Sequence, residues 1–483
     1  MTAGIYSKIL SGVRSRDSEV KGRSTITESE SDRGRVLFCA AFRRLQQKAQ
    51  VFSMEPNAAV RSRLTHSLEV SQLGRFIADE VGVRLVEGGI MTLDEKVAMG
   101  NFVETACLLH DIGNPPFGHF GEAAIQKWFS DFGSECLVSA VPSDLTLCSF
   151  DAIADFREFD GNPQGLRVVS RLQWNNDGFG LNLTKTSLAS FLKYIRVAGA
   201  VPEGLFSKKA GFFSTEESIV KSVWGEFGYA SPQRFPLAYM MEAADDIAYC
   251  VSDLEDSIEK GLVHQPSALL EIRQSFMDIS KGGVAHDEIL GAIDLIIKGR
   301  REDGKEFTYT DFRTRLNRII VGYVADRYRD FHDQVLSGCL EDILPATEAP
   351  GAILESLKAY CRNNVYRHES VQRIELAGYT AIKGLLDQFK PLLQASRDRF
   401  NCALGDKKKD ANGLPIVIES KFLNIFPEKY IKVYRESVAG LGFEMEDNIR
   451  EWNLRAHLVV DFISGMTDDF AMTTYRTLAG MRL

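Results

Sequence analysis

The hydrophobic residues along the chain recur mainly at intervals of three and four, which is the spacing of an amphipathic helix. This spacing predicts helices at about 35–45, 64–83, 93–111, 186–197, 213–227, 233–262, 308–336, 369–395, 427–440 and 446–464. Gly113, Pro115 and Pro116 would end the helix over 93–111, and the segment FGHFGEAAIQKWF (117–129) would open another. The pattern indicates a mainly α-helical protein with many helices.

Signals for other kinds of structure are weak. Alternation of apolar and polar residues over 306–312 and 414–420 predicts at most a few short strands. Clusters of Gly, Pro, Asn and Asp indicate an irregular insert at 131–185. The first 34 residues are polar and rich in Ser, Arg and Glu, which predicts a mobile arm or a loop ordered by ligand, and not a packed element. We therefore expect a polar arm (1–34), a helical core (35–265) and a helical C-terminal region (266–483).

The composition narrows the class of protein. With 483 residues, 45% hydrophobic and 25% charged, the chain can bury a large core and does not resemble disordered, collagen-like or disulfide-scaffold proteins. Its eight cysteines are scattered without a CxxC pair, and no apolar stretch approaches about 18 residues, so we expect a reduced, cytoplasmic protein without a membrane span. The net charge of −9 is compatible with a local basic cleft. Histidine is scarce, yet three of the eight lie between His66 and His119.

Two of these histidines combine with acidic residues in a way that suits a metal ion. His110 and Asp111 are adjacent at the end of an apolar helix, His66 lies on a second predicted helix and Asp245 on a third. Two imidazoles and two carboxylates suit a divalent ion such as Mn, Fe, Mg or Co, and an octahedral ion would keep positions open for water or phosphate. Those open positions are what metal-assisted hydrolysis requires. A His-Asp dipeptide alone is common and is equally compatible with a structural role.

Longer motifs around these residues make the pattern specific. His110 follows His66 by 44 residues and Asp245 follows Asp111 by 134, a spacing that resembles the HD-domain phosphohydrolase superfamily. Five segments resemble bacterial deoxyguanosine triphosphate triphosphohydrolases: FRRLQQKAQVF (42–52), RSRLTHSLEV (61–70), HDIGNPPFGHFGEAAI (110–125), MEAADDIAYCVSDLEDSIEKG (241–261) and VVDFISGMTDDFA (459–471). The resemblance covers residues from about 32 to 475 and makes the expected core an HD-domain catalytic core.

The resemblance implies roles for the reactive residues. The metal ligands would be His66, His110, Asp111 and Asp245, with Asp246 as the competitor for the last place. His119 and Glu122 lie three residues apart at a predicted helix start, where both can face one cleft, and the resemblance makes them the catalytic pair that activates water or protonates the departing 5′ oxygen. Which of the two is the acid is left open. Without the motif, a helix cap beside a buried histidine would explain them as well.

A triphosphate also needs cations along its path. Arg63 precedes His66 by three residues and so shares its helix face. The resemblance favours phosphate contacts from Arg63, Lys193 and Lys209, with Tyr194 alongside and Asn114 close to a phosphate. Taken singly, the arginine and the lysines would be ordinary surface cations.

The remaining substrate contacts also rest on the resemblance. Asp245, Tyr249 and Asp253 recur every four residues and therefore share one helix stripe. Tyr249 would pack on the deoxyribose and exclude a 2′-hydroxyl, and Asp253 would bond the 3′-hydroxyl. Glu375 would accept hydrogen bonds from guanine, although it could equally be a solvated helix residue. Gln50 and Val51 are expected near the sugar and Asn162 near the base.

The leading hypothesis is a metal-dependent enzyme that hydrolyses dGTP to deoxyguanosine and triphosphate and contributes to control of dNTP pools. Alternatives are a broader dNTP triphosphohydrolase and an HD-type nucleotidase or phosphodiesterase. A regulator that binds single-stranded nucleic acid through Arg14, Arg16, Lys21, Arg23 and the 407–409 lysines is the non-enzymatic alternative. The resemblance also implies a homo-oligomer, a hexamer, in which a neighbouring subunit's C-terminal arginine reaches the site. Here lysines occupy that region, at 407–409 and 421.

Overall fold

The computed structural model describes residues 4–141, 148–174, 177–300 and 304–481 and confirms the mainly α-helical fold. Up to the end of the expected core it contains α1 (Ile5–Ile9), α2 (Thr25–Leu37), α3 (Ala40–Arg44), η1 (Leu45–Gln47), α4 (Arg63–Glu87), α5 (Leu93–Leu109), α6 (Gly118–Ala140), α7 (Cys148–Arg157), α8 (Gly161–Arg167), η2 (Val168–Leu172), α9 (Lys185–Phe191), η3 (Ser214–Glu216), α10 (Glu217–Glu226) and α11 (Pro236–Glu259). A parallel pair, β1 (Arg196–Val197) and β2 (Ala210–Phe212), is the one sheet of the described chain.

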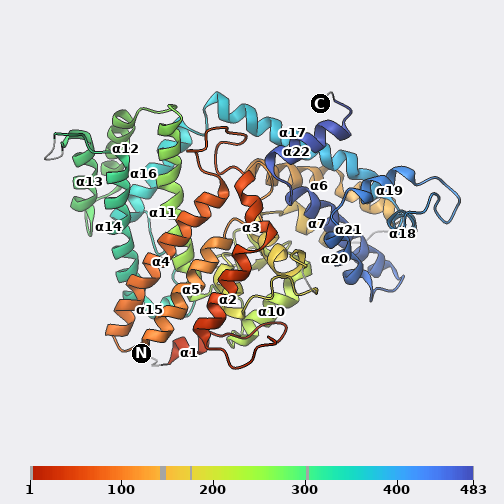
Figure 1. Cartoon of the computed structure of the whole chain (residues 1–483), viewed down its shortest axis with the longest axis horizontal. Helices are drawn as coiled ribbons and strands as arrows, with labels where there is room; N and C mark the ends of the chain where they lie inside the picture. Colours follow the sequence, from red (N-terminus) through yellow and green to blue (C-terminus); the bar gives the residue numbers. More distant parts are fainter. Residues whose placement is uncertain (1–3, 142–147, 175–176, 301–303, 482–483) are drawn as a thin grey trace.

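The C-terminal region is helical as well. It contains α12 (Gln265–Ile279), α13 (His286–Lys298), α14 (Tyr309–Asp330), α15 (His332–Leu336), α16 (Ala349–Asn364), α17 (Glu369–Gln394), α18 (Arg397–Leu404), α19 (Val417–Asn424), α20 (Glu428–Val438), α21 (Met445–Ser464) and α22 (Asp468–Leu478). Figure 1 shows α12, α13, α14 and α16 beside α11 at one end of the molecule, and α18–α21 at the other. No helix within the described ranges is long and apolar enough to cross a membrane.

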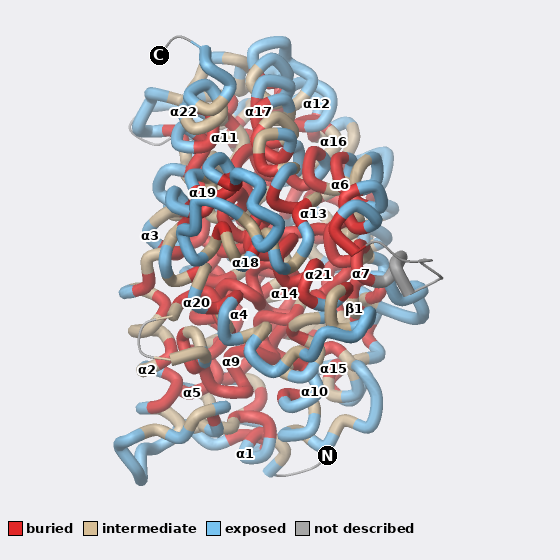
Figure 2. Tube along the Cα trace, turned by 90° about the vertical axis from the view of Figure 1, so that its right-hand side faces the viewer, coloured by how far each residue is buried: buried red, intermediate tan, exposed pale blue. Residues whose placement is uncertain are grey.

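The helices that carry the reactive residues pack closely at the centre. Ser62 starts α4 with a capping box to Thr65, and the helix then packs along α5 and α11. Gly74 of α4 allows this approach, because a Cβ there would lie 2.4 Å from the Cys107 sulfur of α5. Figure 2 shows the buried residues running through the length of the molecule, so these helices are held on several sides.

The polar N-terminal segment is folded into the protein, and the prediction of a mobile, unpacked arm is wrong. The Arg14 side chain is only 2% exposed and forms ion pairs with Glu28 and Asp32 of α2. The buried Tyr6 hydroxyl lies 3.0 Å from His332 Nε2, more than 300 residues away in sequence. Polar residues pack here because each finds a charged or hydrogen-bonding partner, a relation that composition does not reveal.

Other boundaries differ from the sequence prediction. The helix expected over 35–45 is two helices, because α2 begins earlier and Cys39 caps α3 separately. The stretch 306–312 is no strand: Thr308 forms a capping box with Asp311 and starts α14. The stretch 414–420 is no strand either, since α19 begins within it. These short alternating patterns could not distinguish a strand from a helix start.

The insert at 131–185 is more regular than its composition suggests, although 142–147 and 175–176 lie outside the described residues. α6 continues to Ala140, and α7, α8 and η2 follow. Some glycines of the insert allow close contacts between elements, whereas Gly180 lies in a turn with φ of 59°. A Cβ at Gly165 would lie 2.7 Å from the Phe191 ring, so this glycine lets α8 approach α9.

Candidate active site

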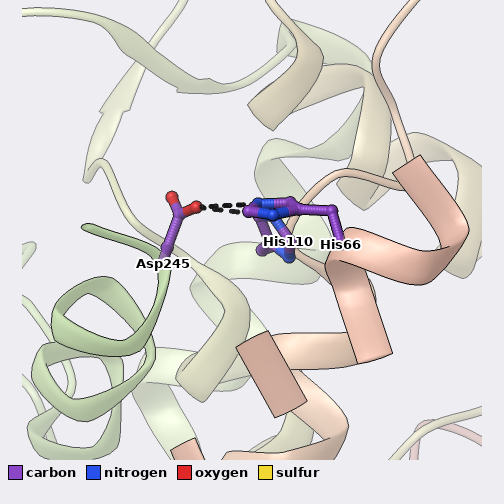
Figure 3. A group of neighbouring side chains, drawn as sticks. All are labelled: His66, His110 and Asp245. Carbon is purple, nitrogen blue, oxygen red and sulfur yellow. Dashed lines mark ion pairs between the residues drawn. The ribbon is translucent and has the colours of Figure 1, made fainter. Parts of the chain in front are cut away.

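His66, His110 and Asp245 meet at the centre of the fold although they come from three helices. Each offers a ligand atom, and these atoms lie within 4.8 Å of one another, the one such grouping found among the described residues. Oδ1 of Asp245 lies 3.6 Å from His66 Nε2 and 3.5 Å from His110 Nε2. Figure 3 shows the carboxylate of α11 directed at the two imidazole rings. Asp111 adjoins them, with Oδ2 3.6 Å from His110 Nε2, and we call these four residues the histidine–aspartate group.

The donor atoms of this group fit a divalent metal ion. Both ring nitrogens of His66 and Nε2 of His110 are buried without a hydrogen-bond partner, which is costly unless another ligand satisfies them. His110 Nδ1 lies 2.7 Å from the Cys107 carbonyl oxygen, an arrangement that leaves Nε2 available as a donor to metal. Mixed imidazole and carboxylate donors suit borderline and hard divalent ions.

The two carboxylates of the group are held in their charged form. Burial alone would raise the pKa of the Asp111 carboxyl, but the Arg63 guanidinium and the two imidazoles hold it at about 2. Arg63 Nη1 donates to Asp111 Oδ2 at 2.6 Å. The pKa of Asp245 is likewise depressed, because the effects of His110, Lys193 and His66 exceed that of burial. A charged carboxylate is the form that binds metal.

A row of alternating charges leads from Asp245 into the core. Lys193 Nζ lies 3.4 Å from Asp245 Oδ2 and 3.6 Å from Glu242 Oε1. Arg234, 1% exposed, pairs with the other oxygen of Glu242 at 2.5 Å. Burial would lower the pKa of Lys193, but Glu242 and Asp245 raise it, so the ammonium remains charged beside the Asp245 carboxylate.

His119 and Glu122 form a hydrogen-bonded pair in the first turns of α6. His119 Nδ1 lies 2.7 Å from Glu122 Oε2, and the Gly161 backbone N–H donates to Glu122 Oε1 at 2.8 Å. The hydrogen bond to Glu122 raises the pKa of His119. The His119 side chain is 83% exposed while Glu122 is buried, so a fixed carboxylate orients an accessible imidazole.

One cavity of about 560 Å³ connects these features. Its wall includes His110, Asp111, Asp245, His119 and Glu122. The substrate residues proposed from the sequence that line it are Gln50, Val51, Arg63, Asn114, Asn162, Lys193, Tyr194, Lys209, Tyr249 and Glu375. His66 lies behind the wall, fully buried. Lys209 forms an ion pair with Asp160 at 2.6 Å. Burial raises the pKa of Glu375, which lies close enough to His119 for their charges to interact.

Asp253 does not line this cavity. It is fully buried, and the Tyr366 hydroxyl donates to its Oδ2 at 2.5 Å. The Tyr249 and Tyr366 hydroxyl oxygens lie 2.7 Å apart, and both rings face the cavity. We call Tyr249, Asp253 and Tyr366 the tyrosine wall. Burial raises the pKa of Asp253 to about 7, so this carboxyl gains and loses its proton near neutral pH.

Sequence reasoning missed Tyr366 and Lys358, which α16 and its C-terminal end bring to the cavity. Lys358 Nζ lies 3.4 Å from Asp246 Oδ1, and both residues line the cavity. Asp246 is therefore occupied elsewhere, whereas Asp245 joins the histidines. Neither Tyr366 nor Lys358 sits in a recognisable sequence motif, so only the packing of the folded chain shows that they reach the cavity.

The basic residues proposed to bind nucleic acid are partly engaged within the chain. Arg14 is buried in its ion pairs with α2, and Arg16 pairs with Asp177 at 2.7 Å. Lys21 pairs with Asp17 on the surface. Arg14 is therefore not available to a phosphate backbone.

Comparison with known proteins agrees with the geometry. The HD domain family matches residues 63–140, which include two histidines of the group, Asp111, His119 and Glu122. The chain therefore contains an HD domain.

Curated relatives identify the family more closely. A probable deoxyguanosinetriphosphate triphosphohydrolase of Pseudomonas aeruginosa is 36% identical, with 99% of each chain covered. The deoxyguanosinetriphosphate triphosphohydrolases of Serratia proteamaculans and Cronobacter sakazakii are 38% and 37% identical, covering 94% and 93% of each chain. The chain belongs to the deoxyguanosinetriphosphate triphosphohydrolase family and is an enzyme.

Proposed function

We propose that this enzyme hydrolyses dGTP to deoxyguanosine and inorganic triphosphate by attack of water on the α-phosphorus. The observation that supports the proposal is that one cavity joins the histidine–aspartate group, the His119–Glu122 pair, the cations of Arg63, Lys193 and Lys209, and the rings of Tyr249 and Tyr366. The curated relatives carry this activity in their names. A role in the control of dNTP pools, in the cytoplasm, follows from the proposed reaction.

The histidine–aspartate group would hold a divalent ion, Mg or Mn in the first instance and Fe or Co as alternatives. A bound ion would supply charge stabilisation at the α-phosphate and orientation of the water. Arg63 serves the same region from the protein, because it contacts Asp111 and lines the cavity. Lys193 and Lys209 place further positive charge along the triphosphate.

His119 and Glu122 carry the proton chemistry. The raised pKa of His119 favours its charged form, which can donate a proton to the 5′ oxygen as the bond from that oxygen to the α-phosphorus breaks. The oxygen of the attacking water becomes part of triphosphate, and the proton that this water releases to solvent balances the one that His119 donates and then regains. Glu122 holds the imidazolium through Nδ1. The products are neutral deoxyguanosine and intact triphosphate.

The tyrosine wall and Glu375 would determine which sugar and which base the cavity accepts. The Tyr249 ring, held through its hydroxyl by Tyr366, would lie against the deoxyribose and leave no space for a 2′-hydroxyl. Tyr366 covers Asp253, so a 3′-hydroxyl reaches this carboxyl only if the tyrosine hydroxyl gives way. Glu375 would accept from the guanine edge.

The deciding experiment is hydrolysis of each dNTP in ¹⁸O-labelled water with Mg²⁺ or Mn²⁺. We expect deoxyguanosine and triphosphate from dGTP, with the label in triphosphate only. Label in deoxyguanosine would contradict attack at phosphorus. Release of orthophosphate from dGMP or opening of a cyclic nucleotide would favour an HD nucleotidase or phosphodiesterase, and equal rates with all four dNTPs would favour a broader triphosphohydrolase.

A homo-oligomer, with a hexamer as the expected form, and binding of single-stranded DNA remain predictions from the family resemblance. Analytical ultracentrifugation tests the first. Salt-dependent binding of a labelled oligonucleotide tests the second. The pairing of Arg14 with α2 limits the N-terminal contribution to Arg16, Lys21 and Arg23.

A further inference from the structure

One sequence motif has no residue in the cavity wall. The segment VVDFISGMTDDFA (459–471) forms the end of α21, the corner that follows it and the start of α22, and none of its residues lines the cavity. Several of its polar residues are nevertheless buried: Ser464 and Asp468 are each 3% exposed. A buried charge at a helix start needs a specific partner.

Asp468 finds two partners, and each is the backbone of a loop at the active site. Its Oδ2 accepts a hydrogen bond from the Ala49 N–H at 3.1 Å, and its Oδ1 accepts one from the Phe117 N–H at 3.1 Å. The two donors are 68 residues apart in sequence and belong to the segments before α4 and before α6. A single carboxylate therefore joins both loops to the start of α22.

Lys48 makes a second connection between the same three segments. Its Nζ donates to the Asn114 carbonyl at 2.5 Å and to the Ser464 carbonyl at 2.8 Å. The side chain is 4% exposed, so both contacts lie within the protein. We call Lys48, Ser464 and Asp468 the corner contacts.

The tethered positions directly precede residues that face the substrate cavity. Ala49 is followed by Gln50 and Val51, and Phe117 by Gly118 and His119. Phe117 has a left-handed backbone with φ of 61° and precedes α6, whose first turn carries His119. A non-glycine residue keeps this conformation only when its surroundings hold it. The Asp468 carboxylate does so, and its charge also favours the amino end of α6.

We propose that Asp468 is a positioning residue that fixes the Ala49 and Phe117 loops relative to each other, so that the sugar-side residues and the His119–Glu122 pair face the same nucleotide. The inference rests on the proposed function of this cavity. The histidine–aspartate group depends less on these loops, because His66 and Asp245 belong to α4 and α11, and His110 directly follows α5 as its C-cap. Loss of the tether should therefore impair positioning and leave metal binding intact.

The test compares Asp468→Ala and Asp468→Asn with the control Asp469→Asn. Asp469 is the next residue of α22 and is exposed, so the control removes a charge from the same helix start without touching the loops. Hydrogen exchange of peptides 46–53 and 115–121 should rise in Asp468→Ala, less in Asp468→Asn, which keeps one acceptor oxygen, and not in the control. Exchange in 64–75 and 240–250 should stay unchanged.

Kinetics and metal binding complete the test. We expect kcat for dGTP to fall about 10- to 100-fold in Asp468→Ala, since small misplacements of reacting groups have effects of this size. Mn²⁺ affinity by calorimetry should stay within about twofold, as the ligands are on other elements. Unchanged exchange in both loops, unchanged kcat, or exchange raised throughout the chain would each overturn the inference. If the wild type releases no triphosphate, the proposed function fails while the exchange data still decide whether Asp468 holds the loops.

Discussion

The two sides of the cavity are built in opposite ways. In the histidine–aspartate group, His66 and Asp245 sit on long helices, and His110 and Asp111 directly follow α5. Its carboxylates are held charged, and several imidazole nitrogens lack a partner among the described residues. In the tyrosine wall the hydroxyls bond to one another and to a buried carboxyl whose pKa is raised to about 7. One side is arranged to receive an external cation, and the other is nearly complete by itself. The difference suggests that the first side supplies the reaction and the second the selection.

The largest effect is expected when a proposed metal ligand of the histidine–aspartate group is removed. Asp245→Ala removes the carboxylate that both imidazoles approach, and we expect loss of bound metal and a fall in kcat of about 10³-fold or more. Metal content by mass spectrometry and dGTP turnover measure it. Asp246→Ala is the matched control, because Asp246 pairs with Lys358 and should leave metal content unchanged. Metal retained by Asp245→Ala would refute the ligand assignment.

The next largest effect is expected from a change in the His119–Glu122 pair, which should lower the rate of reaction without changing metal binding. Glu122→Gln keeps an acceptor for the Gly161 N–H but removes the charge that stabilises protonated His119. We expect kcat to fall about 10²-fold with metal content unchanged. The NMR-titrated pKa of His119 should also drop toward the ordinary value, because the Glu122 hydrogen bond raises it. A variant with wild-type kcat would rule out the assigned role.

A smaller effect is expected on the free energy of unfolding, whose pH dependence tests whether Asp253 of the tyrosine wall is protonated. Asp253 has a folded-state pKa of about 7 against 3.8 unfolded, so between these values the folded protein binds a proton that the unfolded chain releases. Stability contributed by this group therefore falls as pH rises and is lost by about pH 7. From pH 5.5 to 8 the wild type should lose about 2 kcal/mol more than Asp253→Asn in urea unfolding. Parallel curves for the two proteins would show that Asp253 is ionised throughout.

The smallest effect concerns selection alone. Tyr249→Ala should raise kcat/KM for GTP relative to dGTP about tenfold, because removing the ring opens space at the 2′ position. Tyr366→Phe, which keeps a ring but loses both hydroxyl contacts, should change this ratio less. An unchanged ratio in Tyr249→Ala would place discrimination against ribonucleotides elsewhere.

The same contrast explains what the sequence could predict. Helix periodicity located α4, α5, α6 and α11 because each is long and packs along one face, and the proposed metal ligands lie on α4 and α11 or directly after α5, within recognisable motifs. The sequence did not predict Tyr366 and Lys358 as cavity residues, because their positions depend on how α16 packs against α11, more than 100 residues away in sequence. The packing of the N-terminal segment could not be predicted for a related reason: the partners that bury Arg14 include the distant Asn182 carbonyl as well as Glu28 and Asp32.

Gly378 of α17 lies one turn beyond Glu375, and a Cβ there would fall 2.2 Å from the Phe117 ring. The helix bearing the proposed guanine contact can therefore rest against α6 only while this position has no side chain. A single added methyl group would force α17 or the Phe117 ring to move, and because Phe117 lines the cavity, the cavity near Glu375 would change shape without a substitution among the proposed nucleotide contacts. We therefore expect the proposed base preference to depend on the spacing of these two helices as well as on the residues that line the cavity.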